Sequence, residues 1–130
     1  MPIDRGRTRV SDNREAVGHG GLSVVRHDVD GVAVLGLEGE VDYQSASALT
    51  RAMPRADADP GRRLVLDLSR VTFMDSSGVN ALIGAHQARQ PVEGWLRLAG
   101  VRGAVLRTLQ LVGLDAVIVC CPSVEDAVRP

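Results

Sequence analysis

The stretch Phe73-Met74-Asp75-Ser76-Ser77-Gly78 is the most informative feature of the chain, because a strand gives way to a helix around it. The apolar run at residues 64–68 is typical of a strand buried on both faces, and residues 79–89 have the spacing of a helix. Two adjacent hydroxyls therefore lie where a strand is followed by a helix. The first turn of a helix has unpaired N–H groups and a partial positive charge, so a phosphate attached there would find donors.

This stretch has two interpretations. The structural one is that Asp75 or Ser76 caps the helix, since Asp and Ser are preferred at that position. The functional one is that the Ser76 hydroxyl, at an exposed helix start, is a phosphate acceptor. Local sequence by itself favours the cap, and both interpretations stay open at this point.

The segments before this stretch predict a hairpin and a helix. Residues 22–27 and 32–38 are β-like runs separated by a segment that contains the pair Asp30-Gly31, a strong hairpin signal. A helix is expected to begin near Ser45, and the breaker Pro60-Gly61 marks the loop that follows it. The first two strands are therefore predicted to be antiparallel.

The segments after it alternate between strands and helices. A strand is predicted at 95–99 and another at 116–120, with a helical repeat between them at Val101, Val105, Leu109 and Val112. Gly113 is placed to end that helix, and Ser123 to cap a short last one. Such alternation indicates parallel strands with crossover helices. We predict an α/β fold: a single domain over 21–130, with a mixed sheet flanked by helices.

The remaining segment, residues 1–20, is polar and rich in Arg and Gly. It has no apolar core of the kind found in secretory signals, and it reads as a flexible tail.

Composition excludes several kinds of chemistry. The 15 basic residues are all Arg, so a Walker lysine, a Schiff-base lysine and a Ser-x-x-Lys pair are absent. The formal net charge of −1 gives no reason to expect a nucleic-acid or membrane partner, and no apolar run approaches the ~18 residues of a membrane span. The 14 glycines form no phosphate-binding loop. We expect no cofactor.

Cysteine and histidine add no metal site and no catalytic apparatus. Cys120 and Cys121 are neighbours whose side chains point apart in a strand, which indicates reduced thiols and a cytoplasmic protein. The histidines, His19, His27 and His86, lack metal-ligand spacing, and His86 is expected at the rim of the core. A hydrolase using Ser76 would need a positioned base, and the G-x-S-x-G pattern is missing. We therefore expect a protein that is not an enzyme.

Acidic residues occupy two informative positions. Glu40 and Asp42 come at the end of a strand and before a helix, where they either form the turn or contact a partner. Asp67 lies in the middle of a strand, and a local hydrogen bond is expected for it.

At three places the chain resembles one family. The 73–78 stretch looks like the phosphorylation motif of bacterial anti-sigma factor antagonists, which are single STAS domains. The turn Gly39-Glu40-Val41-Asp42 resembles the family's Gly-Glu-(Leu/Ile)-Asp turn, and Val112-Gly113-Leu114 resembles its small-Gly-Leu segment. Order and spacing agree from about residue 22 to 128. Asn80, where many members have Gly, and the longer tail depart from the pattern.

The resemblance implies a switch between partners. Its partners would be a serine kinase that doubles as an anti-sigma factor, and a serine phosphatase. The dephosphorylated antagonist would bind the kinase and free a sigma factor. Ser76 would be the acceptor, with Ser77 as the alternative. The implied partner-binding residues are Glu40, Asp42, Asp75, Ser76, Ser77, Gly78 and Asn80. The alternative function is a STAS interaction module of a transport or stress-signalling assembly that phosphorylation does not regulate.

Overall fold

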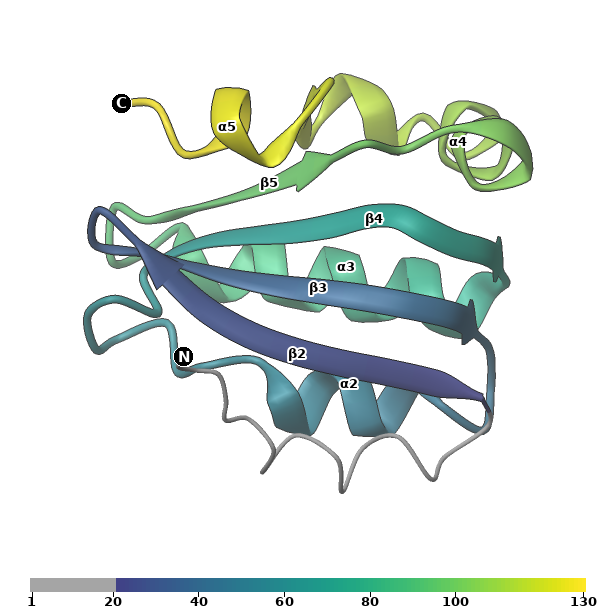
Figure 1. Cartoon of the computed structure of the whole chain (residues 1–130), viewed down its shortest axis with the longest axis horizontal. Helices are drawn as coiled ribbons and strands as arrows, with labels where there is room; N and C mark the ends of the chain where they lie inside the picture. The colour runs from purple at the N-terminus through teal and green to yellow at the C-terminus, as the bar shows by residue number, and fades with distance from the viewer. Residues whose placement is uncertain (1–20) are drawn as a thin grey trace, which may run out of the picture.

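The computed structural model of the chain describes residues 21–130, so the predicted tail lies outside the described residues. These residues form a five-stranded sheet in the order β2-β3-β4-β5-β6 (Figure 1). The strands are β2 (Leu22–Val29), β3 (Val32–Val41), β4 (Arg63–Met74), β5 (Trp95–Ala99) and β6 (Val119–Cys121). The helices are α2 (Ala46–Ala52), α3 (Ser76–Arg89), α4 (Gly103–Leu111), the 3-10 turn η2 (Leu114–Ala116) and α5 (Val124–Ala127).

The opening hairpin is confirmed. β2 and β3 are antiparallel, and the pair Val29 and Val32 closes a turn made of Asp30 and Gly31. Both turn residues have positive φ, 53° and 80°, which is the geometry that a tight two-residue hairpin requires. The strands that follow β3 in the sheet are all parallel to their neighbours, so the predicted mixed sheet is also confirmed.

The carboxyl ends of β3 and β4 extend past β5. β4 pairs with β5 only from Arg63 to Asp67, but it stays paired with β3 as far as Met74. At the right of Figure 1 β2 stays paired with β3 as far as the pair Leu22 and Gly39, so only the last residues of β3 and β4 form a two-stranded ribbon. Both strands are longer than the apolar runs at 32–38 and 64–68 predict. Polar side chains such as Thr72 interrupt the runs, while the pairing continues through two register irregularities.

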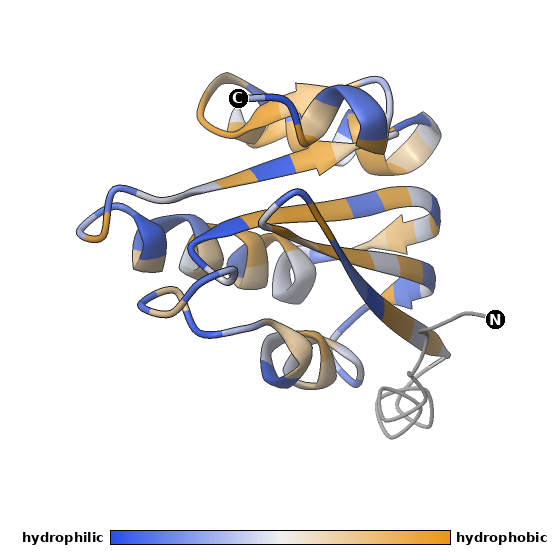
Figure 2. Cartoon of the chain, turned by 60° about the vertical axis from the view of Figure 1, so that its left-hand side comes forward, coloured by the Kyte–Doolittle hydropathy of each residue, from blue (hydrophilic) through white to orange (hydrophobic). Residues whose placement is uncertain are grey.

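Helices cover the two faces of the sheet unequally. On one face α2, α3 and α4 pack over a large apolar cluster that includes Leu35, Leu66 and Leu98 of the central strands. On the other face α5 packs over a smaller cluster that includes Val34 and Val65. The central strands are covered on both sides, which explains their continuous apolar sequence and the long orange stretches in Figure 2.

The last third of the chain differs from the prediction in the final strand and in the helix before it, because α4 includes neither Val101 nor Val112 of the predicted stripe. Gly113 does end α4, with a φ of 77°. Leu114 then turns into the core, so residues 114–116 form η2 and the final strand begins at Val119 rather than at residue 116. Val112 is 57% exposed and does not belong to the buried stripe of α4. Exposed apolar residues in this region made the predicted strand too long.

A buried arginine fixes the far end of α3. Arg89 is 2% exposed, and its Nε, Nη1 and Nη2 each donate a 3.0 Å hydrogen bond, to the carbonyl oxygens of Gly61, Ala85 and Pro54. Burial lowers the pKa of the Arg89 guanidinium, because the charged form loses solvation. The side chain ties the loop between α2 and β4 to the helix.

Candidate functional site

Asp75, and not Ser76, caps α3. Its backbone is extended, and its Oδ1 accepts hydrogen bonds from the backbone N–H groups of Ser77 at 2.8 Å and Gly78 at 3.3 Å. Ser76 is the first helical residue; it is exposed, and its hydroxyl forms no hydrogen bond to the described residues 21–130. Asp75 therefore fulfils the capping interpretation, and the Ser76 hydroxyl is not needed for the cap.

Gly78 has a packing role in the site. It is buried, and a Cβ added to it would lie 2.6 Å from Cγ of Met74 and 2.9 Å from Cγ1 of Val41. Only a residue without a side chain lets the first turn of α3 pack this closely on the ends of β3 and β4. Gly78 therefore positions the neighbouring serines, and its burial leaves it little surface to offer a partner.

The turn after β3 is held by its own side chains. Oδ1 of Asp42 accepts hydrogen bonds at 3.0 Å from the backbone N–H groups of Gln44 and Ser45. Ser45 is fully buried; its Oγ accepts a 2.9 Å bond from the Asp42 N–H and donates one of 2.9 Å to the Glu40 carbonyl. Asp42 is therefore half-buried and forms the turn, as its local sequence predicts.

The fold brings this turn and the serine motif together. Glu40 is in register with Phe73 and Val41 with Met74, and the Asp75 N–H donates a 3.1 Å bond to the Val41 carbonyl. The structure thus places all seven predicted partner-binding residues at one end of the sheet. Three of them are exposed (Glu40, Ser76, Asn80), three are half-buried (Asp42, Asp75, Ser77) and Gly78 is buried.

Three residues at this end of the sheet are not among the predicted site residues. The sequence predicts Ser45 only as a helix start, although its spacing from Asp42 is a side-chain-to-backbone turn signal. Tyr43 and Phe73 have no predicted role of their own; they are 84% and 45% exposed. The signal that could have found them is the scarcity of aromatic residues in the chain.

No imidazole of the described part of the chain can serve Ser76 as a base. His86 follows it by ten positions on the same helix, a rise of about 15 Å. His27 is in register with Val34, near the hairpin at the opposite end of the sheet. His86 does lie at the rim of the core, where its Nε2 is 3.4 Å from Nε2 of Gln90 while its buried Nδ1 has no partner among the described residues.

Other reactive groups are isolated. Within residues 21–130 no three His, Cys, Asp or Glu side chains are placed to hold a metal ion. Cys120 and Cys121 are both unbridged, and burial, followed by the charge of Asp115, raises the pKa of the Cys120 thiol. Asp67 accepts a local 3.1 Å hydrogen bond from the Ser69 N–H, as predicted. No helix in the described segment has the length and apolar character needed to cross a bilayer.

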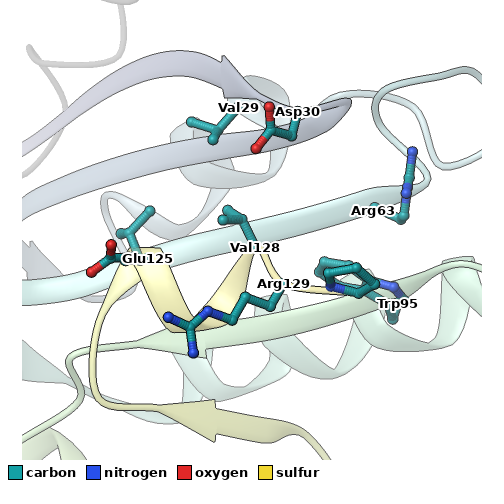
Figure 3. A pocket seen from close by; sticks show the side chains of 9 residues that line it. Val29, Asp30, Arg63, Trp95, Glu125, Val128 and Arg129 are labelled. Carbon is teal, nitrogen blue, oxygen red and sulfur yellow. The ribbon is translucent and has the colours of Figure 1, made fainter.

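A hollow of about 670 Å³ lies at the other end of the sheet (Figure 3). Its walls come from the hairpin residues Val29 and Asp30, from Arg63 and Trp95 at the starts of β4 and β5, and from α5 and the residues after it. Ser76 follows the opposite end of β4, so this hollow is separate from the serine site.

The fold and this site define a class: small α/β domains with a mixed sheet that present a serine at a helix start beside an acidic turn. The chain belongs to the STAS domain family, whose model matches residues 23–127.

Known proteins of this family resemble the chain over most of its length. An anti-sigma-F factor antagonist, RsfB, of Mycobacterium tuberculosis is 36% identical over 110 residues, covering 82% of this chain and 86% of the relative. The crystal structure of an anti-sigma factor antagonist from Mycobacterium paratuberculosis has a TM-score of 0.72 at 32% identity, covering 82% of this chain and 90% of that one. The unphosphorylated form of SpoIIAA, also an anti-sigma factor antagonist, has a TM-score of 0.70 at 23% identity, covering 82% and 93%; at this identity it shows the fold alone.

Proposed function

We propose that this chain is an anti-sigma factor antagonist that binds an anti-sigma factor serine kinase, and that phosphorylation of Ser76 prevents this binding. The observation that carries the proposal is the exposed Ser76 hydroxyl, which forms no hydrogen bond to the described residues because Asp75 caps the helix. The names of the relatives support the class of partner.

Access favours Ser76 as the acceptor. A kinase must bring a γ-phosphate in line with the hydroxyl, so the acceptor side chain has to reach into a cleft of another protein. Ser76 follows the end of the two-stranded ribbon formed by β3 and β4, which extends beyond β5. Ser77 is half-buried, and its N–H is held by the cap, so it is the poorer acceptor.

Charge explains how a phosphate there would release the partner. A phosphate adds about −1.5 to −2 charges at neutral pH. The Ser77 and Gly78 N–H groups already bond to the Asp75 carboxylate, so the new charge would meet a like charge beside it. In the free protein water solvates that charge. In a complex, the phosphate would lose this water to a partner surface that fits a neutral hydroxyl. The loss would cost about 3–4 kcal/mol, which lowers the affinity a hundred- to thousandfold.

The proposed cycle needs no refolding of the domain. The dephosphorylated chain binds the kinase and so frees a sigma factor; the kinase phosphorylates Ser76 and is released; a serine phosphatase restores the hydroxyl. The chain acts throughout as a cytoplasmic regulatory binding protein without a cofactor, and not as an enzyme.

The test is phosphorylation by candidate kinases. The full chain is incubated with each purified anti-sigma factor kinase of its organism and ATP, then analysed by intact mass and peptide mapping. We expect one added phosphate on Ser76, no addition to Ser76→Ala, and normal addition to the matched control Ser77→Ala. A phosphate that maps to Ser77 would move the acceptor by one residue. If no kinase modifies either serine, the unregulated STAS interaction module replaces this proposal.

A further inference from the structure

We infer that Tyr43 and Phe73 anchor the protein partner, by inserting their rings into apolar recesses on the anti-sigma factor next to the surface that receives Ser76. The inference rests on the proposed function and adds to it the residues that supply affinity. Aromatic residues are enriched at the centres of protein interfaces, where a few side chains dominate the binding energy.

The distribution of aromatic residues is the first observation. The chain has one Phe, one Tyr and one Trp in 130 residues, and none of them lies in the core. Trp95 is half-buried, and the Arg97 guanidinium lies over its ring, 3.7 Å from the ring centre. This cation–π contact gives Trp95 a structural role within the domain. Tyr43 and Phe73 expose 84% and 45% of their surface. The Tyr43 ring buries too little surface to contribute much to folding, and Phe73 leaves a large part of its ring available to a partner.

Their place in the fold is the second observation. Phe73 is in register with Glu40 on the ribbon, and Tyr43 follows Asp42 in the turn that leaves β3. The hydrogen bond from the Asp75 N–H to the Val41 carbonyl holds these two segments together. Tyr43 therefore lies in the turn after β3, and Phe73 lies three positions before Ser76, at the end of the sheet where α3 begins.

The backbone beneath Tyr43 is already fixed. Asp42 and the buried Ser45, its neighbours in the turn, share the side-chain hydrogen bonds described above. The Tyr43 hydroxyl itself bonds to nothing within residues 21–130. A rigid turn carrying a side chain with few rotatable bonds loses little entropy when a partner buries it. This arrangement suits a binding anchor.

These features specify the chemistry of the partner surface. It needs an apolar recess for each ring and a hydrogen-bonding group at the bottom of the Tyr43 recess, because a buried phenol hydroxyl requires a partner. It must also accept the acidic side chain of Glu40 at the rim.

The test is a calorimetric titration of the anti-sigma factor with unphosphorylated variants of the full chain. We expect Tyr43→Ala to weaken binding at least about tenfold, Phe73→Thr about fivefold, and Tyr43→Phe less than Tyr43→Ala. The matched control is Leu111→Ala, which truncates an apolar side chain that is 87% exposed at the end of α4; its affinity should stay within about twofold of wild type. As a phosphorylation substrate, Tyr43→Ala should raise KM with kcat nearly unchanged, the signature of lost docking.

The outcomes separate this inference from the proposed function. If the wild type binds and is phosphorylated while Tyr43→Ala matches Leu111→Ala, the anchors are wrong and the function stands. If the wild type neither binds nor accepts phosphate, both fall. Denaturant melts accompany each titration, and should Phe73→Thr prove unfolded, Tyr43→Ala decides the matter.

Discussion

The polar side chains at the two ends of α3 differ in burial and in hydrogen bonding. At the C-terminal end Arg89 is buried, and each of its nitrogen groups donates to a backbone carbonyl. At the N-terminal end Ser76 is exposed, and its hydroxyl bonds to none of the described residues, because Asp75 has taken the capping position. The Arg89 guanidinium is therefore bonded inside the fold, whereas the Ser76 hydroxyl is accessible to another molecule.

Under the proposed function, this difference places residues for stability and residues for partner binding at opposite ends of a single helix. A buried polar group that is hydrogen-bonded to the backbone stabilises the fold, and its loss leaves its partners unsatisfied. An exposed and unbonded group adds little to stability, so it can be modified without harm to the fold. The comparison predicts that substitutions at the two ends affect different measurements.

The largest effect is expected at Ser76. Ser76→Asp should weaken kinase binding a hundred- to thousandfold, about 3–4 kcal/mol, because it adds charge where the partner meets a neutral group. Ser76→Ala should bind as wild type does. Both should unfold at the same denaturant concentration as wild type, since the first turn of a helix tolerates Asp. Equal affinities of the two variants by calorimetry would contradict the electrostatic mechanism.

The next largest effect is expected at Arg89, on the stability of the fold and not on kinase affinity. Arg89→Ala should lower the free energy of unfolding by about 3 kcal/mol, because the carbonyls of Gly61, Ala85 and Pro54 lose their donor. Arg89→Lys should lower it less, because an ammonium still donates. Urea melts give the stability, and a titration at low temperature should show unchanged kinase affinity for the folded protein. Weaker kinase binding by fully folded Arg89→Lys would show that the C-terminal end of α3 also affects partner binding.

A smaller, mixed effect is expected at Asp42, which tests whether the binding end of α3 includes the neighbouring turn. Asp42→Ala should weaken kinase binding while costing the fold at most about 1 kcal/mol, the scale of a lost turn or cap interaction. Asp42→Asn keeps an oxygen for the Gln44 and Ser45 N–H groups and should be the more stable variant. Severe unfolding without a separate binding defect would make Asp42 purely structural.

The smallest effect sharpens the role of the cap. Asp75→Ala should cost about 1 kcal/mol of stability, the usual value of an N-cap. Asp75→Asn should cost less, since an amide oxygen can accept the same bonds from Ser77 and Gly78. Paired urea melts measure the difference. If Asp75→Ala is as stable as wild type, another group caps α3, and the Ser76 hydroxyl is the first candidate.

Local sequence patterns were enough to predict the order of the elements and the place of the serine between strand and helix. Asp30-Gly31 predicted the hairpin, and alternating strand and helix patterns predicted the parallel part of the sheet. These features are local: they depend on turn geometry and on hydrophobic spacing over a few residues. The resemblance of the 73–78 stretch to a phosphorylation motif was likewise visible in the sequence.

Which side chain is buried, hydrogen-bonded or exposed depends on the tertiary contacts. In the folded chain Asp75 caps α3, and Ser76 is exposed to solvent. Arg89 is buried against a loop almost thirty residues away in sequence. The tertiary contacts also make Gly78 a close-packing residue and leave Tyr43 and Phe73 on the surface. The physical reason is that burial and hydrogen bonding depend on which distant segments meet, whereas a local pattern fixes only what the backbone of each segment prefers.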